Sequence, residues 1–506
     1  MNILARLIDG AARHGDRPFV LSDEGTMTWG AMAERTLRLS SALAARGVGP
    51  GSHVALMCSN RPAFLVAWFA IANRGAVTVP VNTGLVGEGL RYTLRQSDST
   101  ALVIEDAILE EKRADLGELL DGLSVLSFTG EDGLDAHAAG FAPDAPFAGD
   151  GTEDCTIIYT SGTTGLPKGV LNSHRAYLAC GRATVEMLGL GPDDRIMVFL
   201  PLFHTNPQMY AVMSVLETGA ALVLRPRFSV STFFDDARRF GATGFTYVGT
   251  VLAMLTARLR DPDRDHRLRF CVGGGAPAEV WRLVEDRYGI TVHELYGMTE
   301  IGGWVTGNTV ARSRFGTCGA ARADMEVRVF DAHDRPVPPG VRGEIVVRPR
   351  EPFVILSGYY RNPEATLAAS RNLWFHTGDS GSFDTDGFLA FHGRLKEIIR
   401  RGGENISPVA VEVALLDHPD VEDAAVVGVP DPIFGEEVKA VLVARRPIEP
   451  AAVPAFLRGR LPDFMLPRYV QFVDRIPKTE TQKIQRHLLQ RLEDGVVDLR
   501  PGGRDQ

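Results

Sequence analysis

Hydroxyl-bearing residues and glycines gather with a single lysine in one short segment, residues 159–170. These twelve residues include three threonines, one serine, three glycines and Lys168, and none of them is acidic. Glycine lets backbone amides approach an anion closely, hydroxyl groups add donors, and a lysine supplies a point charge. The segment therefore predicts a phosphate-binding loop after a short strand, although solvent-exposed loops often share this composition. Its spacing differs from Gly-x4-Gly-Lys-Ser/Thr, which disfavours an ordinary P-loop nucleotidase.

The same segment resembles the signature loop of the adenylate-forming superfamily, which includes acyl-CoA synthetases, luciferase-like enzymes and peptide-synthetase adenylation domains. Further motifs follow in the family's order, so that the resemblance covers nearly the whole chain. It implies a mobile loop that wraps the β- and γ-phosphates of ATP. The residues that match this loop are Thr160, Ser161, Gly162, Thr163, Thr164, Gly165 and Lys168.

A second glycine-rich segment, residues 273–278, lies between a predicted strand and a predicted helix. It fits the loose dinucleotide fingerprint Gly-x-Gly-x-x-Ala, and Glu294 follows at a sequence spacing suited to a ribose contact. A nicotinamide-dependent enzyme is therefore one alternative, and a plain strand-to-helix turn is another. In the family that the chain resembles, the same segment flanks adenine. Its residues here are Gly273, Gly274, Gly275, Ala276 and Pro277.

The next motif of the family is matched by residues 296–300. ATP arrives with Mg²⁺, a hard cation that prefers oxygen ligands, and Glu300 is the predicted ligand. The resemblance implies that Tyr296 packs on adenine and that Thr299 reaches the α-phosphate, with Gly297 and Met298 beside the nucleotide. Without the other motifs, a core tyrosine beside a solvated glutamate would explain the segment equally well.

Three residues of the C-terminal third match further nucleotide contacts of the family. Asp379 matches the ribose-binding acid, since an ionised carboxylate can accept from both vicinal hydroxyls. Arg394 matches a nucleotide-contacting arginine, and Lys396 matches the hinge about which the small domain turns. By itself, this stretch is also typical of a turn followed by a charged linker.

Lys483 matches the catalytic lysine of the final motif, residues 477–486. A cation there can bridge the attacking carboxylate and the α-phosphate while negative charge moves onto pyrophosphate. Gln482 stands where the family usually has glycine, which predicts a stiffer lysine loop.

His204 matches a gate between the ATP and acyl sites, although a half-buried structural histidine is the alternative. Residues 205–210 contain no acid, so we expect a substrate without a free α-ammonium group. An apolar acyl pocket is expected from Asn206, Tyr247, Val248, Gly249, Gly302, Gly303 and Trp304. The paired glycines either open room for a bulky acid or form a turn.

Together these motifs predict an acid–thiol ligase that uses ATP, Mg²⁺ and coenzyme A, with a hydrophobic carboxylic acid as substrate. The resemblance places Gly402, Gly403 and Glu404 along the pantetheine channel. Within the family, the chain is loosely similar to carnitine/crotonobetaine-, medium-chain- and aryl-CoA ligases. A carrier protein as the thiol acceptor is the main alternative. A non-catalytic nucleotide-binding protein is disfavoured because the charged groups of every motif are present.

The elements that must position these residues alternate between helical and strand periodicity. A helix at 31–46, a strand at 54–57, a helix capped by Asn60 and a strand at 76–81 indicate a parallel sheet covered by helices. The expected fold is α/β. A large domain at 1–394 contains a β-rich subdomain at about 316–392, a mobile α+β domain follows at 395–495, and 496–506 form a polar tail.

Composition narrows the class of protein. The 506 residues are 45% hydrophobic and 23% charged, with a net charge of −9, which is typical of a globular protein and disfavours nucleic acid or anionic lipid as a partner. Five cysteines without a Cys-x-x-Cys pair suit a reducing compartment. No signal peptide is predicted, because Asp9 comes before any long apolar run. No membrane span is predicted, because the most apolar stretch, 62–72, is too short. We expect a cytoplasmic bacterial enzyme of catabolism or secondary metabolism, either a monomer or a homodimer.

Overall fold

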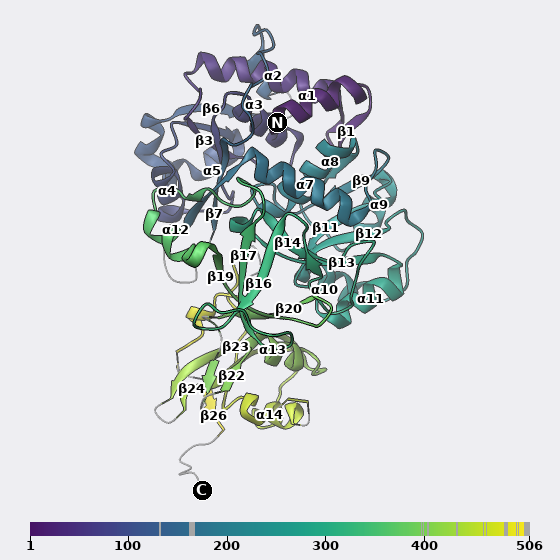
Figure 1. Ribbon diagram of the computed structural model, residues 1–506, viewed down its shortest axis with the longest axis vertical. Helices are drawn as coiled ribbons and strands as arrows, with labels where there is room; N and C mark the ends of the chain where they lie inside the picture. The colour runs from purple at the N-terminus through teal and green to yellow at the C-terminus, as the bar shows by residue number, and fades with distance from the viewer. Residues whose placement is uncertain are drawn as a thin grey trace. The chain divides into compact units, whose positions relative to one another are not determined.

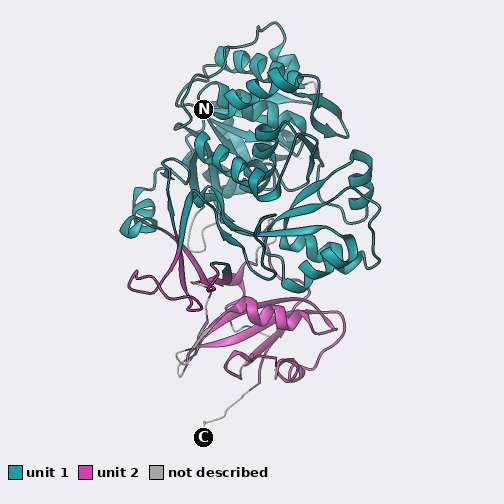
Figure 2. Ribbon diagram, turned by 45° about the vertical axis from the view of Figure 1, so that its right-hand side comes forward, with its two compact units in different colours: residues 1–327, 347–375, 387–389 teal, residues 328–346, 376–386, 390–506 magenta. Residues whose placement is uncertain are grey.

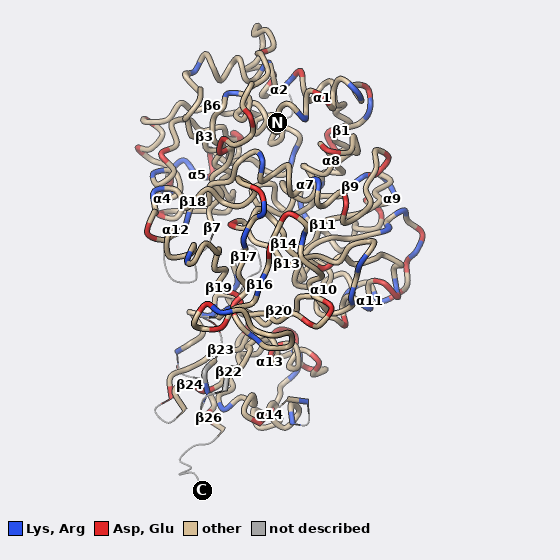
Figure 3. The backbone as a smooth tube through the Cα atoms, in the orientation of Figure 1, with Lys and Arg blue, Asp and Glu red and all other residues tan. Residues whose placement is uncertain are grey.

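The structure, a computed structural model, divides the chain into two compact units (Figure 2). The first unit contains residues 1–327, 347–375 and 387–389, and the second contains 328–346, 376–386 and 390–506. Basic and acidic residues are interspersed along the chain in both units (Figure 3). The structure describes residues 1–130, 133–160, 167–395, 397, 399–401, 404–431, 434–458, 460–461, 463–479, 484–491, 493 and 495–499. Within these ranges, no helix is long and apolar enough to cross a membrane.

The first sheet of the first unit has the strand order β15-β14-β13-β12-β11-β9-β10-β1-β2. Figure 1 labels β14, β13, β12, β11, β9 and β1 of this sheet. The strands from β13 to β1 run parallel, whereas β14, β15 and β2 are antiparallel additions at the two ends. Because parallel strands end at one edge, the segments that follow β9, β11 and β12 meet there, where ligands bind in open α/β sheets. The strands are β1 (Pro18–Ser22), β2 (Gly25–Thr28), β9 (Arg195–Val198), β10 (Ala221–Leu224), β11 (Gly244–Val248), β12 (Phe270–Gly274), β13 (Thr291–Met298), β14 (Gly303–Gly307) and β15 (Ala320–Ala321).

The second sheet of this unit has the order β18-β8-β7-β4-β3-β5-β6. Its inner strands are parallel, whereas β7 and β8 form an antiparallel hairpin to which β18 adds as another antiparallel strand. The predicted phosphate loop is the connection of this hairpin. The strands are β3 (His53–Met57), β4 (Val77–Pro80), β5 (Ala101–Glu105), β6 (Ser124–Phe128), β7 (Asp154–Thr160), β8 (Lys168–Ser173) and β18 (Gly358–Tyr359).

Helix α3 (Pro62–Asn73) explains the most apolar stretch of the sequence. All of its residues are buried, and they belong to the same hydrophobic core as α1, α2 and α7. A helix that is apolar on every side is stable only where packing surrounds it. The other helices of the unit are α1 (Ile3–His14), α2 (Trp29–Ala45), α4 (Gly87–Gln96), α5 (Asp106–Leu116), α6 (Gly133–Ala138), α7 (His174–Leu188), α8 (Met213–Thr218), α9 (Phe233–Phe240), α10 (Gly249–Arg258), α11 (Ala278–Tyr288) and α12 (Pro363–Ala369).

The predicted capping role of Asn60 is wrong. Arg61 is the N-cap of α3, and it makes no side-chain cap bond. The Asn60 amide instead donates to the Leu200 carbonyl at 2.8 Å and accepts from the Leu202 backbone at 2.8 Å. Backbone groups that are buried without a partner are costly, and the Asn60 amide satisfies two of them in this loop. Asn60 thus holds the segment that leads to His204.

The second unit contains most of a sheet with the order β16-β17-β19-β20, and a further sheet with the order β22-β21-β24-β25-β26, in which β23 also pairs with β24. A hydrophobic core forms beneath α13 and α14, with β23 and β24 at its centre. The elements are β16 (Met325–Phe330), β17 (Gly343–Pro349), β19 (Phe375–Phe383), β20 (Leu389–Arg394), β21 (Ile399–Arg401), β22 (Glu404–Ile406), α13 (Pro408–Leu416), β23 (Val421–Asp431), β24 (Gly435–Ala444), α14 (Ala452–Leu457), β25 (Tyr469–Phe472) and β26 (Val496–Asp498). The expected α/β fold class is confirmed.

Candidate functional site

The β7–β8 hairpin brings Thr160 opposite Lys168, which are partners in its register. Ser161, Gly162, Thr163, Thr164 and Gly165 lie outside the described residues. The two flanks contact different residues: the Thr160 hydroxyl donates to Glu300 Oε1 at 3.3 Å, and Lys168 Nζ lies 4.8 Å from the centre of the Tyr359 ring. The hairpin therefore joins two predicted motifs, the loop and the Glu300 segment, in one cluster.

Tyr359 is a site residue that the sequence did not reveal. Its hydroxyl donates to Glu300 Oε1 at 3.2 Å, so it connects Lys168 to Glu300. Tyr359 reaches this position because β18 pairs with β8, placing Tyr359 opposite Val170. No motif marks it, since the contact depends on strand pairing between segments far apart in the chain.

Glu300 is a buried carboxylate, 6% exposed. The neutral hydroxyls of Thr160 and Tyr359 donate to it, and no lysine or arginine of the described residues forms an ion pair with it. An uncompensated buried carboxylate is costly unless a cation joins it. Its hard oxygen atoms suit Mg²⁺, which binds through one or two carboxylates and substrate phosphates rather than an all-protein cage. The described residues contain no cluster of three or more acid, histidine or cysteine side chains that could hold a metal ion.

Close backbone contact explains the glycines that follow β12. A Cβ on Gly273 would lie 2.0 Å from the Tyr247 carbonyl oxygen, and one on Gly249 would lie 1.8 Å from that of Gly275. The ends of β11 and β12 can therefore approach each other only as glycines. Ala276 and Pro277 complete the turn into α11.

Glu294 lies beneath this turn and holds it by hydrogen bonds. Its carboxylate accepts from the Gly275 amide at 2.5 Å, from the Ala276 amide at 3.1 Å and from the Tyr247 hydroxyl at 2.5 Å. Burial raises the pKa of Glu294 to about 7, and these three bonds act in the opposite direction. The carboxylate is thus engaged by the protein itself, which makes Glu294 a positioning residue for the turn.

We expect stability to depend on pH through Glu294. The pKa of Glu294 is higher in the folded than in the unfolded chain. Its protonation therefore stabilises the folded state at low pH, and this contribution to the free energy of unfolding is lost as pH rises from about 4.5 to about 7. The loss amounts to about 3 kcal/mol. A Glu294→Gln variant lacks this titration, so its melting temperature relative to the wild type should rise between pH 5 and pH 8.

The control for this measurement is Glu279→Gln, which removes the same charge from the exposed first turn of α11. Its melting temperature should differ from that of the wild type by the same amount at both pH values. A Glu294→Gln curve parallel to the wild-type curve would contradict the assignment.

The segment after β9 brings His204 and Asn206 to the carboxyl edge of the sheet. His204 is half-buried, with its ring 4.6 Å from that of Phe203. The Thr205 and Thr299 hydroxyls are 2.8 Å apart, so this segment meets the end of β13. The π-helical residues Pro207–Val212 follow directly, a feature common near functional sites. Tyr296 is buried in β13, with Gly297 and Met298 after it.

The residues expected around the acyl group share this edge but differ in their contacts. Asn206 donates to the Tyr247 carbonyl oxygen at 3.1 Å, close to Val248 and Gly249 at the junction of β11 and α10. A Cβ on Gly302 would lie 2.1 Å from the Val354 carbonyl oxygen, and one on Gly303 would lie 2.6 Å from Cys180 Sγ. The two glycines, with φ of 68° and 88°, therefore form a tight turn.

Trp304, next to this turn, belongs to the hydrophobic core. Its indole Nε1 donates to the Thr184 hydroxyl at 2.9 Å, and the Arg322 guanidinium lies over its ring. The indole group is thus held by partners of the protein itself.

Asp379 and Arg394 form an ion pair in the second unit. Asp379 Oδ1 lies 2.9 Å from Arg394 Nε, and the Asp379 side chain is about 5% exposed. The Thr377 hydroxyl accepts from the Asp379 amide at 3.1 Å and donates to the Ile345 carbonyl at 2.7 Å. These contacts fix the acid between β19 and β20.

The segment around Lys483 is described only at its two ends. Lys483, Gln482, Lys396, Gly402 and Gly403 lie outside the described residues, and Glu404 begins β22. An antiparallel bridge joins Lys478 to Ile484. Lys478 pairs with Asp423 at 2.5 Å, and Arg486 pairs with Glu412 at 2.9 Å. The chain that enters and leaves 480–483 is therefore anchored to β23 and α13.

Comparison with known proteins adds to this geometry. Residues 8–360 match the family model described as AMP-binding enzyme, and residues 410–483 match AMP-binding enzyme C-terminal domain. The chain is 35% identical over 495 residues to the sulfoacetate–CoA ligase of Cupriavidus necator, covering 94% of this chain and 95% of the relative. It is also 35% identical over 484 residues to a feruloyl-CoA synthase of an Amycolatopsis species, covering 94% of each. The crystal structure of ATP-bound MatB from Rhodopseudomonas palustris has a TM-score of 0.88 and 29% identity, covering 97% of this chain and 98% of that one.

Proposed function

The chain belongs to the AMP-binding enzymes, in the acyl-CoA ligase branch of the adenylate-forming superfamily, and from this premise we propose that it converts a hydrophobic carboxylic acid into its CoA thioester. The chain is an AMP-forming acyl-CoA synthetase, and ATP and CoA are the cosubstrates of such ligases. The class of its carboxylic acid substrate is what we propose.

The proposed reaction has two steps. A carboxylate oxygen attacks the α-phosphorus of ATP, the bond from that phosphorus to the bridging oxygen breaks, and pyrophosphate leaves. The thiolate of CoA then attacks the acyl carbon, the carbon–oxygen bond of the adenylate breaks, and AMP leaves. The protein supplies positioning and charge stabilisation in both steps.

The observation that carries this proposal is the cluster of Thr160, Lys168, Glu300 and Tyr359. Two hydroxyl groups donate to the buried Glu300 carboxylate, and Lys168 lies over the ring of Tyr359, which supplies one of these hydroxyls. Thr160 and Lys168 flank the loop that resembles the phosphate-binding signature. When bound at Glu300, Mg²⁺ would neutralise phosphate charge. Lys168 and the hydroxyl groups would orient the phosphates around it. Thr163 and its neighbours in 161–165 would complete the cradle.

The nucleotide base and ribose have separate candidates. We assign adenine to the turn at 273–277 and to Tyr296, and the α-phosphate to Thr299, whose hydroxyl already faces that of Thr205. Asp379 and Arg394 would hold the ribose and its neighbouring phosphate. Glu294 supports the adenine turn from below through its bonds to Gly275 and Ala276.

Lys483 would be the charge-stabilising residue of the first step. A thiol must reach the same carbonyl carbon in the second step, so the lysine has to leave. We propose that the domain at 395–495 turns about Lys396 between the steps, with Gly402, Gly403 and Glu404 along the thiol's path. The anchored flanks at Lys478 and Arg486 would carry Lys483 with the domain.

The lining of the acyl site supports a hydrophobic acid. Tyr247 is fully buried, its hydroxyl is engaged by Glu294, and Val248 and Gly249 follow it. No acid in 205–210 is available for an α-ammonium group, and His204 would separate this pocket from ATP. Gly302, Gly303 and Trp304 would border the pocket through the turn that they form.

Mass spectrometry of products tests this proposal directly. Enzyme, ATP, Mg²⁺ and CoA are incubated with a panel of aryl, medium-chain and short polar acids, with CoA omitted in parallel. Acyl-CoA and AMP from an apolar acid would support the proposal, and turnover confined to polar acids would contradict the assigned acid class. Adenylate that accumulates without a CoA thioester would point to a carrier protein as acceptor.

Replacing Asp379 with asparagine should raise the KM for ATP by about tenfold or more, because an amide loses one acceptor and the charge that pairs with Arg394. Asp386→Asn, in the exposed turn after β19, is the matched control and should leave this KM unchanged. Steady-state kinetics at saturating acid and CoA give the KM for ATP of the two variants. Equal KM values in both variants would exclude Asp379 from ATP binding.

A further inference from the structure

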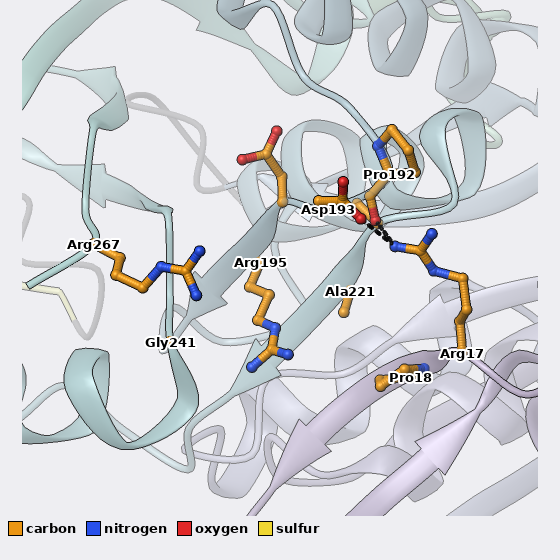
Figure 4. A pocket seen from close by; sticks show the side chains of 10 residues that line it. Arg17, Pro18, Pro192, Asp193, Arg195, Ala221, Gly241 and Arg267 are labelled. Carbon is orange, nitrogen blue, oxygen red and sulfur yellow. Dashed lines mark hydrogen bonds and ion pairs between the residues drawn. The ribbon is translucent and has the colours of Figure 1, made fainter.

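A small pocket opens at the edge of the first sheet that lies opposite the nucleotide turn. Its space is about 210 Å³, and its lining includes Arg17, Arg195, Arg267, Asp193 and Gly241. Figure 4 shows the Arg17–Asp193 pair on one side and the side chains of Arg195 and Arg267 on the other. Parallel strands explain its place, since β9 begins at Arg195, β10 at Ala221 and β1 at Pro18.

This edge is separate from the proposed active site. The residues assigned to adenine and the acyl group follow the carboxyl ends of β9, β11 and β12, whereas the pocket lies at the amino ends of the same sheet. A strand of five residues such as β11 spans about 16 Å. A ligand in the pocket therefore cannot share contacts with a nucleotide at the other edge.

The acids near the pocket are already neutralised. Asp193 pairs with Arg17 at 2.8 Å. Asp194 pairs with Arg269 and also accepts from the Thr243 hydroxyl at 2.7 Å and the Gly191 amide at 2.9 Å. Neither acid has a free charge to offer the remaining arginines.

Two guanidinium groups remain without an acid. In the described part of the chain, neither Arg195 nor Arg267 forms an ion pair, and Arg195 Nη1 donates to the Phe240 carbonyl at 2.7 Å. A Cβ on Gly241 would lie 3.3 Å from Arg195 Nη1 and 3.9 Å from Arg267 Nη1, so these atoms are at most about 7 Å apart. Like charges at this separation repel each other unless an anion lies between them.

We propose that this pocket binds a small phosphate-bearing anion between Arg195 and Arg267. Two unpaired guanidinium groups match an anion of about two charges, and guanidinium forks suit phosphate oxygens. Arg17 lies at the opposite wall, where its charge is paired with that of Asp193. The volume is below that of usual cofactor pockets, which favours free phosphate or a small phosphate monoester over a whole nucleotide.

Calorimetric titration with inorganic phosphate at low salt tests this site, with and without saturating AMP. We expect one phosphate site that AMP does not block, and an affinity at least about tenfold weaker in Arg267→Gln and in Arg195→Gln/Arg267→Gln. Arg267→Gln is included alone because Arg195 also bonds the end of α9. Arg258→Gln, an exposed arginine of α10 without a described acidic partner, is the matched control and should bind like the wild type.

Each outcome bears on the proposal. Glycerol phosphate that binds as well as phosphate would identify an ester site, and phosphate alone would identify a site for the free ion, both in support. Phosphate binding that AMP abolishes completely, or an equal affinity for phosphate in all variants, would overturn the proposal. Adenylate formation is measured separately, so a failed anion site and a failed ligase assignment remain distinguishable.

Discussion

Replacing Lys483 with alanine is expected to slow adenylate formation by about 10²–10³-fold while the transfer of a supplied acyl-adenylate to CoA continues. The proposed role of Lys483 is confined to the first step, in which negative charge moves from the α-phosphate to pyrophosphate. An interaction made only in that transition state lowers kcat without a matching change in substrate affinity. Pyrophosphate release measures the first step, and thioester formation from synthetic adenylate measures the second.

Lys478 provides the matched control in the same segment. Its ammonium group pairs with Asp423, both side chains are partly exposed, and such a pair contributes about 1 kcal/mol or less. Lys478→Ala should therefore slow adenylation only a few-fold. Normal adenylation by the Lys483→Ala protein would refute the proposed mechanism, and an equal loss in both variants would indicate that the alanine merely disturbs the segment.

Glu300→Gln is expected to reduce kcat/KM for ATP by about 10²-fold and to raise the Mg²⁺ concentration needed for half-maximal rate. Glutamine keeps the shape of the side chain and can still accept from Thr160 and Tyr359 through its amide oxygen. It loses the charge that would hold the cation. Initial rates of pyrophosphate release over a Mg²⁺ titration provide the measurement.

Tyr359→Phe separates the charge of Glu300 from its hydrogen bonding. This change removes a donor 3.2 Å from Oε1 but keeps the carboxylate, so a loss of less than about tenfold is expected at an unchanged Mg²⁺ requirement. A Glu300→Gln enzyme with the wild-type Mg²⁺ profile would remove Glu300 from the metal site.

The fold class and the family could be predicted from the sequence because their signals are local. Turn glycines, strand and helix periodicity, and the order of short motifs depend only on neighbouring residues. The helix predicted at 31–46 is observed at Trp29–Ala45, and the strand predicted at 54–57 is observed at His53–Met57. The apolar helix α3 also follows in part, since its length excluded a membrane span.

The role of individual polar residues depended on distant partners. The residue type and position of Asn60 are typical of a helix cap, yet its side-chain amide forms hydrogen bonds with the backbone of Leu200 and Leu202 instead. Glu294 has the spacing of a ribose ligand, yet it is bound by Gly275, Ala276 and Tyr247. Hydrogen-bond partners brought together by the fold are not encoded in the neighbouring sequence.

The sequence by itself predicted the family and the chemistry that we propose for this protein: a phosphate loop, a carboxylate for a hard cation and a lysine, in the order of one enzyme family. Only the tertiary structure decided that Tyr359 joins Lys168 to Glu300, and that Gly302 and Gly303 serve a tight turn. It alone placed Arg195 beside Arg267. The physical reason is that residue type sets what a group can bind, whereas strand pairing and packing set which groups meet.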